Sequence, residues 1–100
     1  MKVHEQITEQ TWCRMYFART QTDDPTPIFS ERAAKWCLVG WLHKVYVSGW
    51  EVSIAVERLN SVLSSVLHGH TSGTGDLARW NNSPHTTFQQ VHELLKRANV

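Results

Sequence analysis

The sequence predicts an all-α fold, a compact single domain of about four helices that spans residues 1–100. Apolar residues recur at helical spacing in four stretches, and loop-type residues separate these stretches. No segment shows the alternation of apolar and polar residues that a half-buried strand requires. A chain of this size, with 41% hydrophobic residues, can bury roughly two-thirds of its unfolded surface. We therefore expect one core and no second domain.

The first predicted helix spans Val3 to Thr20, a stretch that contains neither Gly nor Pro. Its apolar face repeats at helical spacing through Ile7, Met15 and Ala18. The following segment, residues 21–30, holds two aspartates and two prolines. Because each proline also restricts the residue before it, this segment is predicted to be a loop.

The second predicted helix begins after Ser30, a residue type that caps helix N-termini, and runs to Val45. We expect it to be the most buried helix, because its apolar face is wide. Gly40 lies inside it, where a glycine costs about 1 kcal/mol relative to alanine. That cost predicts the close approach of a neighbouring helix or of a bulky ring, with Trp36 and Trp41 as candidates.

Two further helices are predicted in the second half of the chain. The third begins at a capping box, Ser48 with Glu51, and ends near Gly69. A flexible connection rich in Gly, Ser and Thr and a short turn follow, and the last helix begins at Thr86 with Gln89. The predicted core residues are Trp36, Cys37, Trp41, Val56, Leu59, Leu63, Val91 and Leu95.

The cysteines and histidines do not indicate a metal site or a catalytic site. The sequence contains neither CxxC nor HExxH, so we predict no metal and no cofactor. Cys13 and Cys37 fall inside predicted helices, where no helix N-terminus lowers their pKa, and we expect both to be free, buried thiols. The chain also lacks a phosphate-binding loop and a nucleophile elbow. We predict no catalytic residues and no enzyme activity.

Charge and hydropathy exclude further classes of partner. Ten basic and nine acidic residues give a net charge of +1, and no predicted helix carries the clustered Lys and Arg of a DNA-recognition helix. We therefore expect no direct contact with nucleic acid. No apolar stretch is long enough to cross a bilayer, and the first residues lack the apolar core of a signal peptide. A soluble, intracellular protein without a membrane partner is the expectation.

Ten aromatic residues are more than a small helical core needs, so some of them are expected to face a partner. Arginine and tyrosine are typical of interface hot spots, and acids gather in the first third of the chain. For the arginines and the tyrosine, an exposed, solvated surface is the alternative. The candidate partner-binding residues are Glu5, Glu9, Arg14, Tyr16, Arg19, Asp23 and Asp24.

Three motifs carry a resemblance to a family of small helical bacterial and phage domains. The motifs are Trp12-Cys13-x-x-x-Phe17-Ala18-Arg19, Ala34-x-Trp36-Cys37-Leu38-x-Gly40-x-Leu42 and Arg79-Trp80-Asn81-Asn82-x-Pro84-x-x-Thr87-x-x-x-Val91. Within that family, the length and the order of the helices look most similar to phage-encoded anti-CRISPR proteins directed at the type I-F surveillance complex.

The resemblance implies an inhibitor that acts by protein–protein interaction in the cytoplasm of the infected bacterial host. It would bind Cas protein subunits of the complex, as a monomer, and block the binding of target DNA. Acidic residues suit that role, because a CRISPR effector holds nucleic acid in a positively charged channel. The alternative is an uncharacterised small helical regulatory or binding module without catalytic activity.

Overall fold

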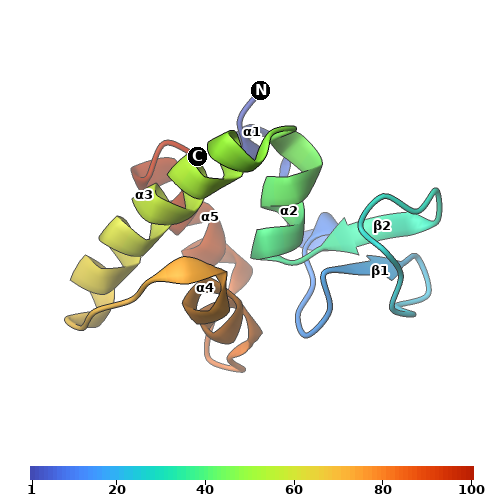
Figure 1. Ribbon diagram of the computed structural model, residues 1–100. Helices are drawn as coiled ribbons and strands as arrows, with labels where there is room; N and C mark the ends of the chain where they lie inside the picture. The colour runs from blue at the N-terminus through green and yellow to red at the C-terminus, as the bar shows by residue number, and fades with distance from the viewer.

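The computed structural model describes all residues from 1 to 100 and shows a mixed α/β fold, so the predicted all-α class is wrong. Figure 1 shows helix α2 standing between a small antiparallel sheet and the other large helices. In chain order the elements are α1 (Val3–Gln6), η1 (Glu9–Thr11, a 3-10 helix), β1 (Ala18–Thr20), β2 (Ala33–Trp36), α2 (Leu38–Val45), α3 (Gly49–Leu67), α4 (Gly73–Asn82) and α5 (Phe88–Arg97).

The N-terminal segment does not form the single predicted helix. Only α1 and η1 are helical there, and the chain then extends into β1, which pairs with β2. Ala18 lies opposite Trp36, and Arg19 lies opposite Lys35. Aromatic and β-branched residues favour extended backbone, and β2 supplies backbone hydrogen-bond partners that periodicity within one segment does not reveal. Pairing between distant segments therefore overrides the helical spacing of the apolar residues.

The second predicted helix begins at Leu38 rather than after Ser30. The Ser30 hydroxyl accepts a hydrogen bond from the Arg32 N–H, which holds a turn instead of capping a helix. Cys37 is the actual N-cap, because its sulfur accepts a hydrogen bond from the Gly40 N–H at 3.3 Å. The resulting helix, α2, is nevertheless the buried helix that the sequence predicts, since all its residues from 38 to 42 are buried.

Helices α3 and α5 agree with the prediction in type and closely in position. The Ser48 hydroxyl accepts a hydrogen bond from the Glu51 N–H at 3.1 Å at the start of α3. The capping box of α5 is formed by Thr87 and Gln90, one residue further along than predicted. The predicted short turn is a full helix, α4, which begins within the predicted connection. None of these helices combines the length and the apolar character that spanning a bilayer requires.

One hydrophobic cluster of 19 buried residues joins the sheet to the helices. Trp36 from β2 and Trp41 from α2 meet edge to face in it, with ring centroids 5.2 Å apart. Cys13 and Cys37 are both free and buried, as predicted. The predicted core residues that are buried are Trp36, Cys37, Trp41, Leu59, Leu63, Val91 and Leu95, and Val56 is partly buried against them.

The close approach predicted at Gly40 is confirmed, but the closest neighbour is a carbonyl group. An ideal Cβ placed on Gly40 would lie 2.2 Å from the backbone oxygen of Phe17 and 3.4 Å from Cβ of Trp36. The same oxygen accepts a hydrogen bond from the Cys37 N–H at 3.2 Å. Glycine therefore allows the start of α2 to pack directly on the backbone that leads into β1.

Candidate functional site

A buried asparagine near the end of α4 holds the loop that follows η1. Oδ1 of Asn81 accepts hydrogen bonds from Nε1 of Trp12 at 2.7 Å and from the Leu38 N–H at 3.1 Å. Its Nδ2 group donates to the backbone oxygen of Cys13 at 3.2 Å. Asn81 is fully buried, so these bonds satisfy polar groups that water does not reach. One side chain thus joins α4, the start of α2 and the loop.

The next turn of this loop is strained and is held from two sides. Met15 has a φ of 78°, a left-handed conformation that is uncommon for residues other than glycine. Its N–H donates to Oδ1 of Asn82 at 2.7 Å. On the other side, the guanidinium of Arg19 donates two hydrogen bonds to the backbone oxygen of Arg14, at 3.2 and 3.0 Å. Such strain persists where the surroundings enforce it, and it is common at functional sites.

Large apolar side chains from this turn and from the loop after β1 are exposed together. Met15 is 65% exposed, Tyr16 49%, Phe17 56% and Phe29 77%. A hollow of about 570 Å³ lies between the two segments, and two prolines contribute to its lining. We call the following group of side chains the aromatic loop face: Met15, Tyr16, Phe17, Pro25, Pro27 and Phe29.

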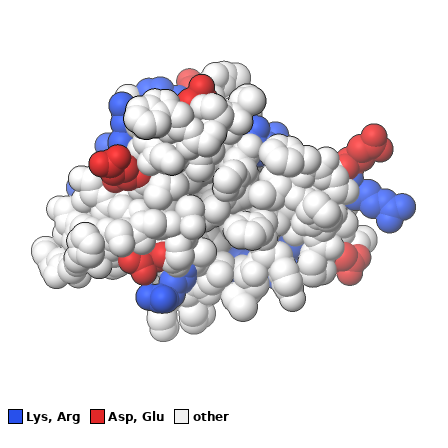
Figure 2. Space-filling view, viewed as in Figure 1, with Lys and Arg blue, Asp and Glu red and all other residues white.

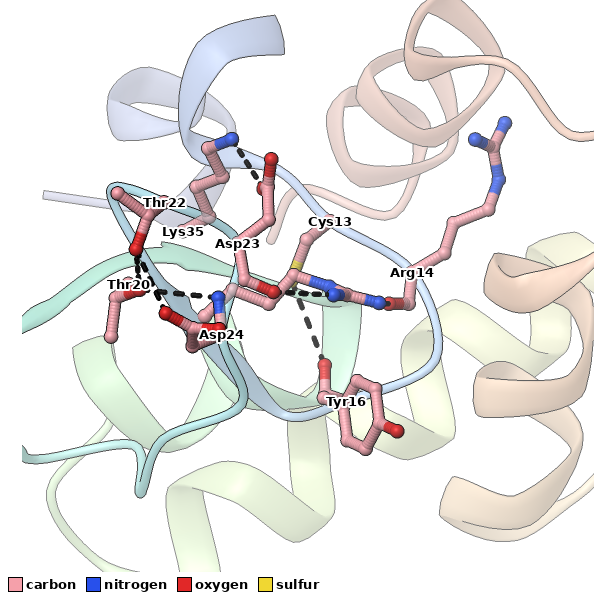
Figure 3. Close-up of polar contacts among 9 residues, drawn as sticks. Cys13, Arg14, Tyr16, Thr20, Thr22, Asp23, Asp24 and Lys35 are labelled. Atoms are coloured by element: carbon pink, nitrogen blue, oxygen red, sulfur yellow. Dashed lines mark hydrogen bonds and ion pairs between the residues drawn. The ribbon is translucent and has the colours of Figure 1, made fainter.

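Cation–π and polar contacts restrain Tyr16 of the aromatic loop face. The guanidinium carbon of Arg19 lies 4.7 Å from the centroid of the Tyr16 ring. Nη1 of the same arginine donates to the backbone oxygen of Asp23 at 2.7 Å. Figure 3 shows Tyr16 near this network, with Cys13 Sγ donating to its backbone oxygen at 3.6 Å. Tyr16 therefore presents a ring whose position is already restricted.

The two predicted acids of the loop after β1 are partly engaged within the protein. Nζ of Lys35 lies 2.6 Å from Oδ1 of Asp23, and this hydrogen bond holds the pKa of Asp23 below its usual value. Oδ2 of Asp24 accepts a hydrogen bond from the hydroxyl of Thr22 at 2.9 Å, as Figure 3 shows. Both side chains remain exposed, but the Asp23 charge is paired. Asp24 is thus the more available of the two acids for a partner.

The other predicted acids lie on different elements. Glu5 belongs to α1, where its carboxylate accepts a hydrogen bond from the Lys2 N–H at 2.7 Å; this bond lowers the pKa of Glu5. Glu9 is exposed in η1, which contacts β2, whereas α1 contacts α2 and α5. The predicted residues that the structure gathers at the aromatic loop face are therefore Tyr16, Arg19, Asp23 and Asp24.

Arg14 is held largely by intramolecular contacts. Its guanidinium lies 4.6 Å from the centroid of the Trp12 ring and donates a hydrogen bond to the backbone oxygen of Thr86. Arg14 thereby links the loop to the start of α5. We expect its contribution to be the shape of the loop rather than direct contact with a partner.

The sequence does not predict most of the aromatic loop face. The helix predicted for residues 3–20 contains Met15 and Phe17, so it does not predict their joint exposure. Phe29 lies in the predicted loop and is not among the candidate residues. A phenylalanine that closely follows Pro25 and Pro27 is the signal that could have identified it, because loop backbone lies at the surface and exposes its side chains.

The buried thiols are poorly suited to nucleophilic chemistry. Burial, and to a smaller extent the nearby Cys37 side chain, raise the pKa of Cys13 to about 11. Cys37 does cap α2, where backbone N–H groups lower its pKa, but burial has the larger effect and the pKa is raised. The thiolate is the reactive form, so neither site favours it. No three His, Cys, Asp or Glu side chains converge in an arrangement that could hold a metal ion.

Comparison with known proteins gives a family but no activity. The model of DUF6197, a family of unknown function, matches residues 1–99. Neither the curated proteins nor the solved structures gave a match. The family match includes α1 to α5, both strands and the aromatic loop face. Because it extends over nearly the whole chain, this protein belongs to the DUF6197 family.

Proposed function

We propose that this protein is a non-catalytic binding module that docks on a protein partner through the aromatic loop face. The observation that carries the proposal is the joint exposure of Tyr16, Phe17 and Phe29 around one hollow, with the exposed side chain of Met15 next to them in the chain. Contiguous exposed apolar patches mark interaction sites, and aromatic residues and methionine are enriched in protein interfaces. An apolar side chain of the partner would fill the hollow.

The restrained backbone supports the same proposal. Asn82 holds the strained turn at Met15, and Arg19 packs on the Tyr16 ring. A surface that is already ordered loses less conformational entropy when a partner binds, so more of the contact energy appears as affinity. Other exposed apolar residues, such as Trp50 and Val47, lie around the start of α3 and have no comparable network among the hydrogen bonds and cation–π contacts.

As the partner we propose the Cas proteins of a type I-F surveillance complex. The resemblance of the three sequence motifs supports this choice. Exposed acids beside the aromatic loop face, Asp24 and Glu31, would complement the basic channel of such a complex. Motif residues such as Gly40 and Asn81 hold the fold, so the motifs support the type of domain more directly than the partner. The action would be to occlude the approach of target DNA.

A matched pair of variants tests the docking face. Tyr16→Ser combined with Phe29→Ser should weaken binding to purified type I-F complex about tenfold or more, because each ring is worth about 1 kcal/mol or more at an interface centre. Trp50→Ser, which alters a ring in α3 about as exposed as that of Phe29, should leave the affinity unchanged. Melting temperatures of all variants should stay near that of the parent.

Order of addition then tests the action. In a gel shift, target DNA should fail to bind when the protein is added to the complex first, and should largely remain bound when DNA is added first. Equal loss of affinity in the Trp50→Ser variant contradicts the docking face. If the protein does not bind the complex at all, the proposed type I-F partner is wrong. The alternative, a small regulatory or binding module that acts on another partner, then stands.

A further inference from the structure

The first half of α3 presents apolar side chains to solvent. Val47, just before the helix, is 96% exposed, Trp50 is 75% exposed and Ile54 is 36% exposed. Because residues four positions apart are neighbours on a helix surface, Trp50 and Ile54 lie on one side of α3. We call Val47, Trp50 and Ile54 the α3 stripe. Figure 1 shows the start of α3 at the periphery of the molecule, close to the C-terminus.

Two opposite charges flank the α3 stripe, and neither is paired within the chain. Glu51 and Arg58 line the same small hollow beside Ile54, with a volume of about 170 Å³, so both lie on one side of the stripe. Both side chains are exposed. Neither takes part in any of the three ion pairs of the protein. Both charges are therefore available to groups of opposite charge on a partner.

The spacing of these charges makes the exposed face of α3 complementary to itself. Glu51 lies about one helical turn before Ile54, and Arg58 lies about one turn after it. When a second copy packs its α3 antiparallel with Ile54 at the crossing point, Glu51 of each copy comes level with Arg58 of the other. A twofold axis keeps these charges on the same side of the contact, so two ion pairs result. A parallel arrangement would instead place like charges together, which is unfavourable.

The shape and the overall charge of the protein are compatible with the same arrangement. The antiparallel packing brings Ile54 of each copy to the hollow beside Ala55 and Val100 of the other, and it shields the Trp50 ring from water. Each copy has a net charge of only +1. Figure 2 shows small groups of both signs, and no large patch of one sign, on the face seen there. Repulsion between two copies is therefore weak.

We infer that the α3 stripe is the contact surface of a weak, twofold-symmetric dimer of this protein. Glu51 and Arg58 set its antiparallel orientation, and Ile54 and Trp50 supply the apolar contact. The stripe is small, so we expect a dissociation constant on the order of tens of micromolar. The monomer that the resemblance implies is then the state below about 1 µM. The interface contains no residue of the aromatic loop face, so the inference is independent of the proposed docking.

Sedimentation equilibrium of the full-length protein, from about 1 µM to about 1 mM, tests the inference. Glu51→Lys and Arg58→Glu should each weaken self-association about tenfold or more, because each replaces two attractive pairs by two repulsive ones. A mixture of these two variants should associate again, since opposite charges face one another in the mixed dimer. Trp50→Ser, which removes apolar contact without a change of charge, should also weaken self-association. Arg97→Glu, which alters an exposed arginine of α5, is the matched control and should leave it unchanged.

Three results would overturn the inference. A protein that stays monomeric over the whole range has no such interface. Equal weakening by Arg97→Glu would assign the association to overall charge. Single variants that weaken self-association, without recovery in the mixture, would place the contact elsewhere. None of these results bears on docking through Tyr16 and Phe29, which the gel shift and the binding assay test separately.

Discussion

Residues 1–37 and residues 38–100 are stabilised in different ways. In the second region, α2 to α5 satisfy their backbone groups within each helix and bury apolar faces against one another. In the first region, short elements are joined by loops, and some of the polar groups of these loops are satisfied by side chains of the second region. Asn81 binds Trp12 and Cys13, and the indole Nε1 of Trp41 donates to the backbone oxygen of Thr11 at 3.0 Å.

The first region therefore depends on the second for its shape. A helix carries its own hydrogen bonds, whereas a loop needs partners that other parts of the chain position. The aromatic loop face belongs to the first region, so the helices ultimately determine the surface that we propose for docking. We expect substitutions at the contacts between the regions to disturb the loops more than the helices.

The largest effect is expected at Trp41, which lies in the second region and contacts Trp36 and Thr11 of the first region. Trp41→Ala should lower the free energy of unfolding by about 3–5 kcal/mol, because it leaves a cavity beside Trp36. Trp41→Phe keeps most of the packing and removes the hydrogen bond to Thr11, so it should cost less. Urea denaturation measures both, with the exposed Trp50→Ala as a control near zero. A Trp41→Ala protein as stable as the parent would contradict the buried position of this ring.

A more selective effect is expected at Asn81. Asn81→Ala removes the acceptor of the Trp12 indole and of the Leu38 N–H, and should cost about 3 kcal/mol. Hydrogen exchange should accelerate first in residues 12–15 and later in α3. Asn82→Ala, which removes the acceptor of the Met15 N–H, should cost about 1 kcal/mol. Equal acceleration in both regions of the Asn81→Ala variant would remove the distinction between them.

Two glycines test the contact between α2 and the first region. Gly40→Ala should destabilise the protein by about 1–3 kcal/mol, because its Cβ would meet the Phe17 carbonyl. Gly75→Ala in α4 meets nothing within 4 Å and should stabilise by up to about 1 kcal/mol through helix propensity. Thermal and urea denaturation of the two variants give the signs directly. Stabilisation by both substitutions would show that the backbone at Phe17 moves at little energetic cost to make room for the added Cβ.

The smallest effect concerns the alkaline stability of the first region. Burial raises the pKa of Cys13 to about 11 from 9.0, so the folded protein keeps a proton that the unfolded chain releases. Its contribution to the free energy of unfolding is therefore complete below about pH 9 and is lost as the pH rises through about 11. Allowing for screening by solvent, we expect a loss of about 1 kcal/mol.

Urea denaturation under reducing conditions, at pH 8 and at pH 10.5, measures this loss. Cys13→Ala should reduce the difference between the two pH values. The comparison needs a variant because the pKa values of Cys37 and Tyr46 are also raised by burial. An unchanged difference in Cys13→Ala would assign the alkaline loss to those groups instead.

Local sequence determined the later helices. The Ser48–Glu51 capping box and the apolar spacing placed α3, and the same signals placed α5 to within one residue. The buried thiols and most of the predicted core also followed from residue type and spacing. These predictions succeed because helix caps and intrahelical hydrogen bonds join residues three or four positions apart.

The shape of the first region and of the aromatic loop face depends on contacts between residues that are far apart in the sequence. Ala18 and Trp36 pair across a sheet, Asn81 binds a loop far away in the sequence, and Gly40 admits the Phe17 carbonyl. Apolar spacing alone favoured a helix for residues 3–20, and that helix would have dispersed the side chains of Met15 and Phe17 around its axis. The strand pairing and the long-range hydrogen bonds instead turn these side chains outward, because each backbone group takes the partner that the folded helices bring to it.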